Sequence, residues 1–497
     1  MGRMQGGIRV LTQDEMDRIH RTTVRILAEV GMRIEHPEGL EYLKGFGCHV
    51  DFDRSHVLFP EDVIEAVLKG FREDAGREDR QGLRMAYRFS EFSFYHHPVE
   101  LTSAFKVSAG GFPPYILDLE GNRRPANIED VRQSIRLADA LPEIDFLGLP
   151  CSAVEVEFRD RPLVMTAELL KGTNRLGGIE VWDRRDIAYV EKMATVVAGS
   201  REELRRRPIL VGYGEAKSPL CFDFNMADLF VEYVKRGFPQ SIDTMPNGGA
   251  TAPGTSAGTL ALGLAETLGG MILGYAIDRG ARLRMDINPG LCDMRSGIFP
   301  YAGADRLSML VGAAQMINQY YGCPGGIHGG KTDACLPGVQ AGYEKALTIL
   351  VPILAGATGI GTIGQLEAGM TYSPVQLVID NEIVAYVRRI LRGFEVNEDT
   401  LAFDVIKEVG IGGQYLNHEH TATHFRDEFF LTGLTERMPW AGWESEELKG
   451  VAEKAVERAR RLMRAEPASH LSAEQEEEIN EILKEALADP KRNEQQK

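Results

Sequence analysis

The chain has 497 residues, of which 43% are hydrophobic and 26% charged, which suits a globular protein with one large domain and an addition, or with two domains. Its formal net charge of −17 argues against a nucleic-acid partner, because phosphate binding needs a basic face. We find no run of 18 apolar residues and no apolar signal segment, so we expect no membrane association and a cytoplasmic location. None of the six cysteines forms a C-x-x-C pair, which favours a reducing compartment and excludes a zinc ribbon.

Residues 1–100 are interpreted as a helical/β extension. Leu11-Thr-Gln-Asp-Glu is a capping signal for a helix that we expect to run to Val30 and to end at Gly31. The elements expected after it are a β-like piece at 50–59 and a helix at 60–71. The histidines expected at the surface or in local hydrogen bonds are His36, His49 and His56.

Between residues 101 and 395 one pattern recurs: a short apolar run, a Gly/Pro/polar break, and an amphipathic helix. The predicted strands are 144–150, 175–181, 208–214, 239–245, 282–287, 323–328 and 358–363. The predicted helices are 161–172, 184–199, 221–236, 255–279, 303–321, 337–356 and 374–392. Successive units of this kind indicate βαβ crossovers and a parallel sheet.

An eighth strand, from 105–118 or from residues after 405, would close a (β/α)₈ TIM barrel over 101–395. The predicted fold class is therefore α/β, with the active site at the C-terminal strand ends. A doubly wound open sheet is the alternative, but no G-x-G-x-x-G follows a first strand. We expect 396–497 to be a helical section packed on the barrel. Its acidic end, 474–497, is expected to be an exposed helix that frays.

The stretch Gly322–Glu344 is rich in glycine and breaks at Gly329-Gly330, before a helix expected at about Pro337. The polar residues that this break presents are His328, Lys331, Thr332 and Asp333. A strand-to-helix loop of this composition is typical of a ligand site, although an ordinary βα turn would explain it equally well.

Polar residues also follow the other predicted strands, where a barrel would bring them together. They are Glu180, Trp182-Asp183, Tyr213, Glu215, Lys217, Ser218, Asp243, Thr244, Asn247–Thr251, Asn288–Arg295, Gln365, Glu367, Met370 and Tyr372. Aromatic residues gather near the same breaks, among them Phe112, Tyr213, Tyr343 and Tyr372. Rings around a cavity suit a quaternary ammonium ion through cation–π attraction, while core packing is the simpler explanation.

The cluster His418-Glu-His420-Thr-Ala-Thr-His424 raises the possibility of a metal site, since residues four apart share one face of a helix. However, no cysteine lies close by and H-E-x-x-H is absent. We therefore assign no metal ligand, and expect this cluster to close over a pocket or to pack the C-terminal section against the barrel.

Several motifs together resemble the trimethylamine methyltransferase family over roughly residues 10–465. They are Ala28-Glu-Val-Gly-Met, Ser218-Pro-Leu-Cys-Phe, the run Met245-Pro-Asn-Gly-Gly-Ala-Thr, Thr332-Asp-Ala, Gln340-Ala-Gly-Tyr-Glu, Asp380-Asn-Glu and His420-Thr-Ala-Thr-His-Phe-Arg. The resemblance implies a TIM barrel that passes a methyl group from an amine to a corrinoid (cobalamin) carried by a partner protein. Trimethylamine enzymes of the family contain pyrrolysine, whereas this chain contains only the ordinary twenty residues. It is thus similar to the relatives without pyrrolysine that act on glycine betaine and other quaternary amines.

For this chemistry the resemblance implies a cage for the methylated cation, a site for a substrate carboxylate, and a face toward the corrinoid. The substrate-binding candidates are Phe112, Tyr213, Arg295, His328, Lys331, Asp333, Tyr343 and Tyr372. The candidates facing the corrinoid are Asn247, Gly248, Gly249, Thr251 and Gln365. No residue is assigned to proton transfer, because a quaternary nitrogen leaves as a neutral amine. We also expect a homo-oligomer.

Two rival functions remain open from the sequence. One is demethylation of another donor, such as a sulfonium or a methoxylated compound. The other is a non-catalytic, substrate-binding subunit of a corrinoid complex.

Overall fold

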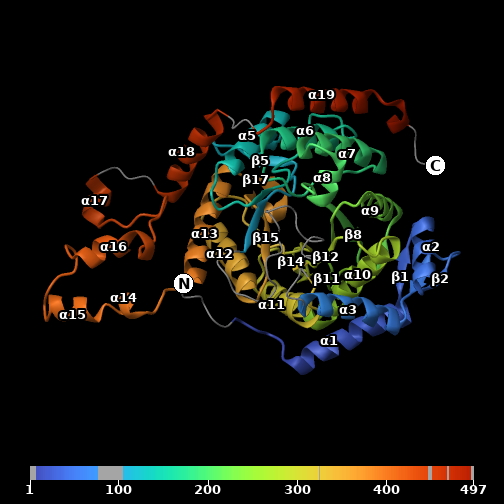
Figure 1. Cartoon of the computed structure of the whole chain (residues 1–497), viewed down its shortest axis with the longest axis horizontal. Helices are drawn as coiled ribbons and strands as arrows, with labels where there is room; N and C mark the ends of the chain where they lie inside the picture. Colours follow the sequence, from blue (N-terminus) through green and yellow to red (C-terminus); the bar gives the residue numbers. More distant parts are fainter. Residues whose placement is uncertain (1–6, 77–104, 324, 446–449, 467–469, 494–497) are drawn as a thin grey trace.

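The computed structural model describes residues 7–76, 105–323, 325–445, 450–466 and 470–493 (Figure 1). It is a mixed α/β protein with short parallel strands at the centre and helices around them. The central strands are β4 (Lys106–Ala109), β7 (Phe146–Leu147), β8 (Gly212–Ala216), β10 (Gln240–Thr244), β12 (Leu283–Asp286), β14 (Gly325–Gly326) and β15 (Gly359–Ile363). The boundary expected at residue 100 lies outside the described residues.

The central strands form two parallel ladders, β14-β12-β10-β8 and β15-β4-β7. The parallel bridges that connect segments beyond these ladders are Leu147↔Leu176, Gly178↔Val211 and Ile327↔Ile360. The structure thus has the expected strand segments, and β4 supplies the one whose origin the sequence left open. It does not form one closed sheet, so the expected barrel is confirmed only as a mixed α/β arrangement.

All seven helices predicted for the repeating units are present. They are α6 (Arg161–Gly172), α7 (Arg184–Ala198), α9 (Phe224–Arg236), α10 (Ser256–Ile277), α11 (Ala304–Ala314) with a π-helical end Gln315–Tyr320, α12 (Val339–Leu354) and α13 (Pro374–Arg392). Two more helices are present: α5 (Ile128–Asp139), where the sequence before the repeating units predicts a helix over about 128–141, and α8 (Arg201–Arg206), which was not predicted. Their ends follow ordinary rules: in α9 the Asp223 side chain accepts from the Met226 amide, and Gly237 ends the helix in the left-handed region.

Further short strands lie outside the two central ladders. They are β5 (Tyr115–Leu117), β6 (Arg123–Pro125), β9 (Cys221–Phe222), β11 (Asn247–Gly248), β13 (Gly290–Leu291), β16 (Gln365–Leu366) and β17 (Thr371–Tyr372), with a 3₁₀ turn at Glu367–Gly369. The strands β16, β17, β5 and β6 form one small sheet, and β11 pairs with β13.

The N-terminal section begins with α1 (Gln13–Arg25), where Thr12 and Glu15 form the predicted capping box. The elements after it are the π-helical turn Ile26–Val30, β1 (Met32–Ile34), α2 (Pro37–Phe46), β2 (His49–Asp51), β3 (His56–Leu58) and α3 (Glu61–Gly76). Its buried apolar side chains belong to the same hydrophobic cluster as those of α9 and α10. The section therefore covers one side of the central strands and shares their core.

For His36 the predicted local hydrogen bond is present, but a surface position is wrong. This residue is only 4% exposed, and its Nε2 lies 3.1 Å from Oδ1 of Asp228 on α9. It also caps α2 through Nδ1, which accepts from the Gly39 amide. His49 is exposed, as predicted, and His56 forms an exposed hydrogen bond to the carbonyl of Val30, 26 residues earlier in the N-terminal section.

Helix α10 is buried along most of its length and is apolar on all sides. By length and composition alone it could cross a membrane, although Glu266 interrupts its apolar sequence. However, 83% of its apolar window is buried inside the protein. A Cβ at Gly270 would lie 2.8 Å from Ile242, and one at Gly274 2.5 Å from Leu283, so glycine lets the strands pack directly on the helix. The apolar side chains of α10 therefore belong to the hydrophobic core of the protein.

The C-terminal section divides into two parts. The first projects from the body as an arm, defined here by its helices α14 (Glu398–Leu401), α15 (Phe403–Val409), α16 (Glu419–Glu428) and α17 (Trp440–Ser445) (Figure 1). The second returns to the body with α18 (Val451–Arg464) against α5 and α13, and α19 (Ala473–Ala488) against α6 and α7.

The prediction that the acidic end frays is wrong for its described residues. Ile479 and Ala486 of α19 are fully buried. The following 3₁₀ turn, Pro490–Asn493, places Arg492 at 3% exposure, with Nε 2.6 Å from Oδ1 of Asp186. A buried, hydrogen-bonded ion pair of this kind anchors the end of the chain to α7.

One ion pair lies completely inside the body. Lys345 of α12 and Asp380 of α13 have no exposed side-chain surface, and their Nζ and Oδ2 atoms are 2.6 Å apart. Asp380 also accepts from the amide of Gly364, 2.6 Å away, and from the side chain of Gln376. The pair therefore joins two helices to the loop that follows β15.

We expect Asp380→Ala to lower the free energy of unfolding by about 3–5 kcal/mol, because it leaves the Lys345 ammonium buried without its partner. Urea unfolding followed by circular dichroism measures this. The control is Glu485→Ala, which removes the exposed partner of Lys192 and should cost less than about 1 kcal/mol. A loss below about 1 kcal/mol for Asp380→Ala would contradict the assigned role.

Candidate active site

A cavity of about 330 Å³ opens at the centre of the strands. Its lining comes from every central strand segment, including those near Ser108, Gly148, Gly178, Val211 and Ser241 along the chain. A volume of this size suits a small molecule. The cavity is therefore the candidate active site.

Charged and aromatic side chains reach the cavity because alternate residues of a strand point to the same side. On β8 these are Tyr213 and Glu215, and on β12 they are Arg284 and Asp286. The register places Ser241 beside Tyr213, and Asp243 beside Glu215. Polar groups from neighbouring strands thus form layers around the cavity.

Asp286 holds the strands together at one side of the cavity. Its carboxylate accepts from the Ser241 hydroxyl and from the amide of Gly326, and it pairs with Arg284. These groups join β10, β12 and β14 in one network. Because the Asp286 carboxylate already has these three partners, we assign it a structural role: it supports the site and does not bind a ligand.

Asp243 and His328 form the central pair, with Nε2 of His328 lying 3.3 Å from Oδ2 of Asp243. The side-chain amide of Asn288 donates to both oxygens of Asp243 at 3.0 Å. Burial, with Asp286 and Glu215 nearby, raises the pKa of Asp243 well above its ordinary value. Burial and the cations Lys331 and Arg306 hold the pKa of His328 well below its ordinary value. The His328 imidazole is therefore neutral near neutral pH, and its environment favours the protonated form of Asp243 more than water would.

Arg306 supports this pair from behind. It is 1% exposed and donates to the carbonyl of Tyr301, to Oδ1 of Asn288 and to the carbonyl of His328. Burial lowers the pKa of Arg306 to about 10, so it remains a cation at neutral pH. It fixes the orientation of Asn288 and of the backbone that carries His328.

Glu180 and Tyr213 form a second pair, in which the Tyr213 hydroxyl donates to Oε1 of Glu180 at 3.3 Å. The other oxygen, Oε2, is buried and has no hydrogen-bond partner among the described residues. Burial raises the pKa of Glu180 from 4.5 to about 7. Glu215 lies next to this pair and also has a raised pKa, first because of burial and then because of Asp223. Glu180 and Glu215 therefore make one side of the cavity acidic.

Lys331 and Gln365 lie just outside the cavity wall. Lys331 donates to the Oε1 atom of Gln365, whose amide donates to the carbonyl of Gly110 at 2.6 Å. The Lys331 ammonium also lies 5.1 Å from the centre of the Tyr301 ring. Burial lowers the pKa of Lys331 to about 7. This arrangement ties the loops after β4, β14 and β15 together.

Asp333 has an anchoring position. Its carboxylate accepts from the amides of Tyr301 at 2.8 Å and Ala302 at 3.0 Å, which fixes the segment before α11. Its own amide donates to Glu344 of α12 at 2.9 Å. Asp333 thus connects two loops and does not line the cavity.

The structure brings only some of the predicted substrate residues to the cavity. Phe112, Tyr213 and His328 line it, with Lys331 and Asp333 behind the wall. Of the remaining three, Arg295 lies in an exposed loop, Tyr343 is 55% exposed on α12, and Tyr372 is fully buried in the core. Those three side chains are therefore not gathered around the ligand space.

The residues predicted to face the corrinoid also lie apart from one another. Asn247 and Gly248 form β11, and Gly249 and Thr251 follow in an exposed loop after β10. The Oδ1 atom of Asn247 is buried and has no hydrogen-bond partner among the described residues. Gln365 is only 1% exposed.

The candidates missing from the predicted set are Glu180, Glu215, Asp243, Arg284 and Asp286. The first three were visible in the sequence as polar residues after predicted strands, but nothing there set them above other loop residues. Arg284 and Asp286 fall inside an apolar strand, and alternation along that strand was the available signal.

The histidines at 418–424 do not reach the cavity. The bonding partners of His418, His420 and His424 lie within the arm, at Glu408 and Asp399. The expectation that this cluster closes over the pocket is therefore wrong.

Comparison with known proteins identifies the family. The family model described as trimethylamine methyltransferase matches residues 2–488. The chain belongs to the trimethylamine methyltransferase family. Among curated relatives, trimethylamine methyltransferase MttB of Desulfitobacterium hafniense is 28% identical over 92% of this chain and 90% of its own. Glycine betaine methyltransferase of the same species is 27% identical over 90% of this chain and 91% of its own.

Members of the trimethylamine methyltransferase family transfer methyl groups, so this chain is an enzyme of that class. A solved structure, the monomethylamine methyltransferase of Methanosarcina barkeri, matches 92% of this chain and 88% of its own. That match has a TM-score of 0.47 and 11% identity.

We expect Glu180→Gln to stabilise the protein at pH 8 by about 1–3 kcal/mol and to leave its stability at pH 4 unchanged. The folded state raises the pKa of Glu180 to about 7, so between about pH 4.5 and pH 7 the unfolded state releases a proton that the folded state retains. The native chain therefore loses stability as the pH rises through this window, and glutamine removes the loss. Urea unfolding at both pH values measures it.

The matched control is Glu478→Gln on the exposed side of α19, which should change stability equally at both pH values. A Glu180→Gln variant with no gain at pH 8 would contradict a protonated, buried carboxyl at this position.

Proposed function

We propose that this chain removes a methyl group from a quaternary amine of the glycine betaine kind and delivers it to the Co(I) corrinoid of a partner protein, in the cytoplasm. The observation that carries this proposal is the acidic, aromatic side of the cavity at Glu180, Tyr213 and Glu215. Family membership supports methyl transfer, and the similarity to a glycine betaine methyltransferase supports the substrate class.

The cation binds between the Tyr213 ring and the two carboxyl groups. A methylated ammonium ion has no N–H to donate, so it is recognised by ring faces and by opposite charge. Its positive charge beside Glu180 favours the carboxylate form, and the buried Oε2 atom gains a partner. Phe112, which lines the cavity after β4, completes the apolar part of this site.

A substrate carboxylate binds at the opposite wall, near His328. Its neutral imidazole can donate one hydrogen bond, and Lys331 and Arg306 behind it provide positive potential. A zwitterion held at both ends has one orientation in the cavity. This matters because methyl transfer needs the N–CH₃ bond aligned with the acceptor.

The reduced corrinoid supplies the nucleophile, so the protein needs no residue for nucleophilic attack. The amine leaves as a neutral molecule and needs no proton. The side chains of this chain therefore bind, orient and exclude water, which agrees with a neutral His328 imidazole beside Asp243.

The partner's corrinoid approaches over the loop after β10. Gly249 and Thr251 are exposed there, next to Asn247 and Gly248 of β11. Gln365 is removed from this set, because it is buried between Lys331 and Gly110. The loop follows the C-terminal end of a central strand, where βα proteins place their sites.

The finer fold that fits this function is a (β/α)₈ barrel with strands joined in the order of the chain. Ladders and single bridges already link the segments in succession around the cavity. A homo-oligomer remains part of the proposal, and the exposed apolar side chains of the arm support it, for example Phe403 and Leu416.

The direct test is to mix the purified chain with chemically reduced Co(I) cobalamin and candidate donors. We expect the absorbance change to methyl-Co(III) with glycine betaine or another quaternary amine, and none with trimethylamine. The panel includes proline betaine, carnitine, choline, a sulfonium and a methoxylated compound.

Transfer only from a sulfonium or a methoxylated donor would replace the proposed substrate. Tight binding of a betaine without transfer, when a matched corrinoid protein is present, would favour the binding-subunit alternative.

A second expectation concerns the size of the substrate. Gly178 lines the cavity, and a Cβ built there meets nothing within 4 Å. Gly178→Val should therefore fold normally but reduce kcat/KM for a bulky donor such as carnitine at least about tenfold more than for glycine betaine. The matched control is Gly342→Val on α12, which also has open space but lies outside the cavity. Equal effects on both donors would contradict this placement.

A further inference from the structure

The arm has almost no hydrophobic core of its own. From residue 393 to residue 444, Leu434 is the one buried side chain. Large apolar residues are exposed instead, such as Phe403 at 69% and Leu416 at 81%. Short helices without a shared core are not stable by themselves, and small units of this kind commonly rely on a disulfide, a metal ion or a partner.

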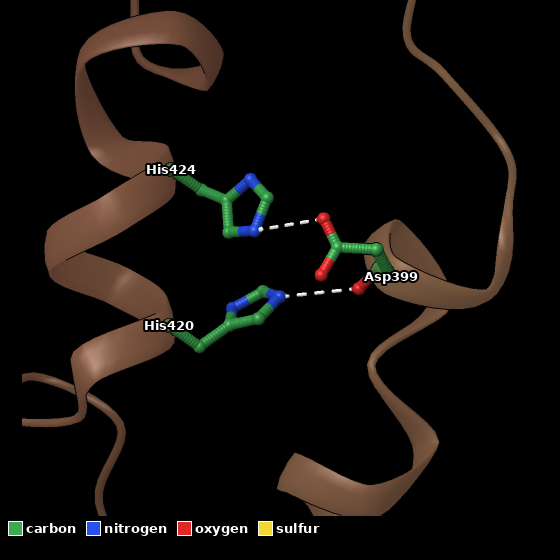
Figure 2. A group of neighbouring side chains, drawn as sticks. All are labelled: Asp399, His420 and His424. Atoms are coloured by element: carbon green, nitrogen blue, oxygen red, sulfur yellow. Dashed lines mark hydrogen bonds and ion pairs between the residues drawn. The ribbon is translucent and has the colours of Figure 1, made fainter.

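Three possible metal ligands meet at one place in the arm (Figure 2). Asp399 comes from α14, and His420 and His424 come from α16. Each offers one ligand atom, and these atoms lie within 4.8 Å of one another. The two imidazole rings are four residues apart on one face of the helix, and both point toward Asp399 (Figure 2).

The distances between these groups fit a metal site as well as they fit hydrogen bonds. Nε2 of His424 lies 3.3 Å from Oδ2 of Asp399, and Nε2 of His420 lies 3.2 Å from the Asp399 carbonyl. These are at the long end of the range for hydrogen bonds. In a tetrahedral zinc site with bonds of about 2.0–2.1 Å, neighbouring ligand atoms are about 3.3 Å apart. The observed His424–Asp399 spacing has this value.

We propose that Asp399, His420 and His424 bind a divalent first-row metal ion, with zinc as the best fit. Two imidazole nitrogens and one carboxylate oxygen form a three-ligand set that zinc accepts, with water in the fourth position. The ion is structural. It connects α14 to α16 and closes the chain between residues 399 and 420, which reduces the freedom of the intervening segment.

This site is independent of the cavity, and therefore of the proposed methyl transfer. The ligands lie in the arm, whereas the cavity is lined by the central strands. The loss of the metal should loosen the arm and leave the unfolding of the body unchanged. A failed methyl-transfer assay would not affect this proposal.

The test uses the whole chain, stripped with a chelator and dialysed. Titration with Zn²⁺ by calorimetry should show one ion bound per chain, and Co²⁺ in its place should give the visible absorption of a tetrahedral site. His424→Gln and Asp399→Asn should each weaken binding at least about tenfold. Zinc should also slow proteolysis in the segment between α15 and α16 at least about threefold.

The matched control is His418→Asn. His418 belongs to the same sequence cluster and caps α16, but its partners are Glu408 and the His420 amide rather than the metal cluster. Asparagine preserves the cap, so this variant should bind zinc like the native chain. No zinc bound by the native chain, or equal binding by His424→Gln, would overturn the proposal.

Discussion

Ionisable side chains can be buried at the centre of this protein because they form ion pairs and hydrogen bonds with one another. Burying a charge without a partner costs several kcal/mol, so each ionisable group near the cavity either has a partner or changes its protonation. Asp286 has Arg284, and Asp243 has a neutral His328 and Asn288. The positions of β10, β12 and β14 follow from these contacts. The site is thus ordered by electrostatic requirements as much as by packing.

Much of the fold was accessible from the sequence, because its signals are local. Capping at Thr12, the repeating order of strands and helices, and the ends of α6 and α13 all depend on residues close together in the chain. Long-range contacts were not accessible. His36 looked like a surface histidine until the fold placed Asp228 beside it, and Arg492 finds Asp186 only after α19 docks on α7.

The candidate site was predicted in outline for the same reason. Alternation along strands brought Tyr213 and His328 to the cavity, but residue type alone suggested Tyr343 and Tyr372 as well. Whether an aromatic ring faces a ligand, solvent or the core depends on which helix covers it. Sequence composition could not supply this, because exposure is a property of the packed elements. Glu180 was visible as a polar residue, and its raised pKa follows only from its burial.

Glycine is the most frequent residue type in the cavity wall, and examples are Gly110, Gly148, Gly178, Gly326 and Gly361. Not all of these positions are equivalent: a Cβ added at Gly178 meets nothing within 4 Å, whereas a Cβ added at Gly148 would lie 3.1 Å from the carbonyl oxygen of Gly178. At the open positions a single codon change adds a methyl group to the wall without disturbing the body. Substrate range in such a lineage can therefore diverge by small steps, while the framework of strands and buried ion pairs is inherited intact.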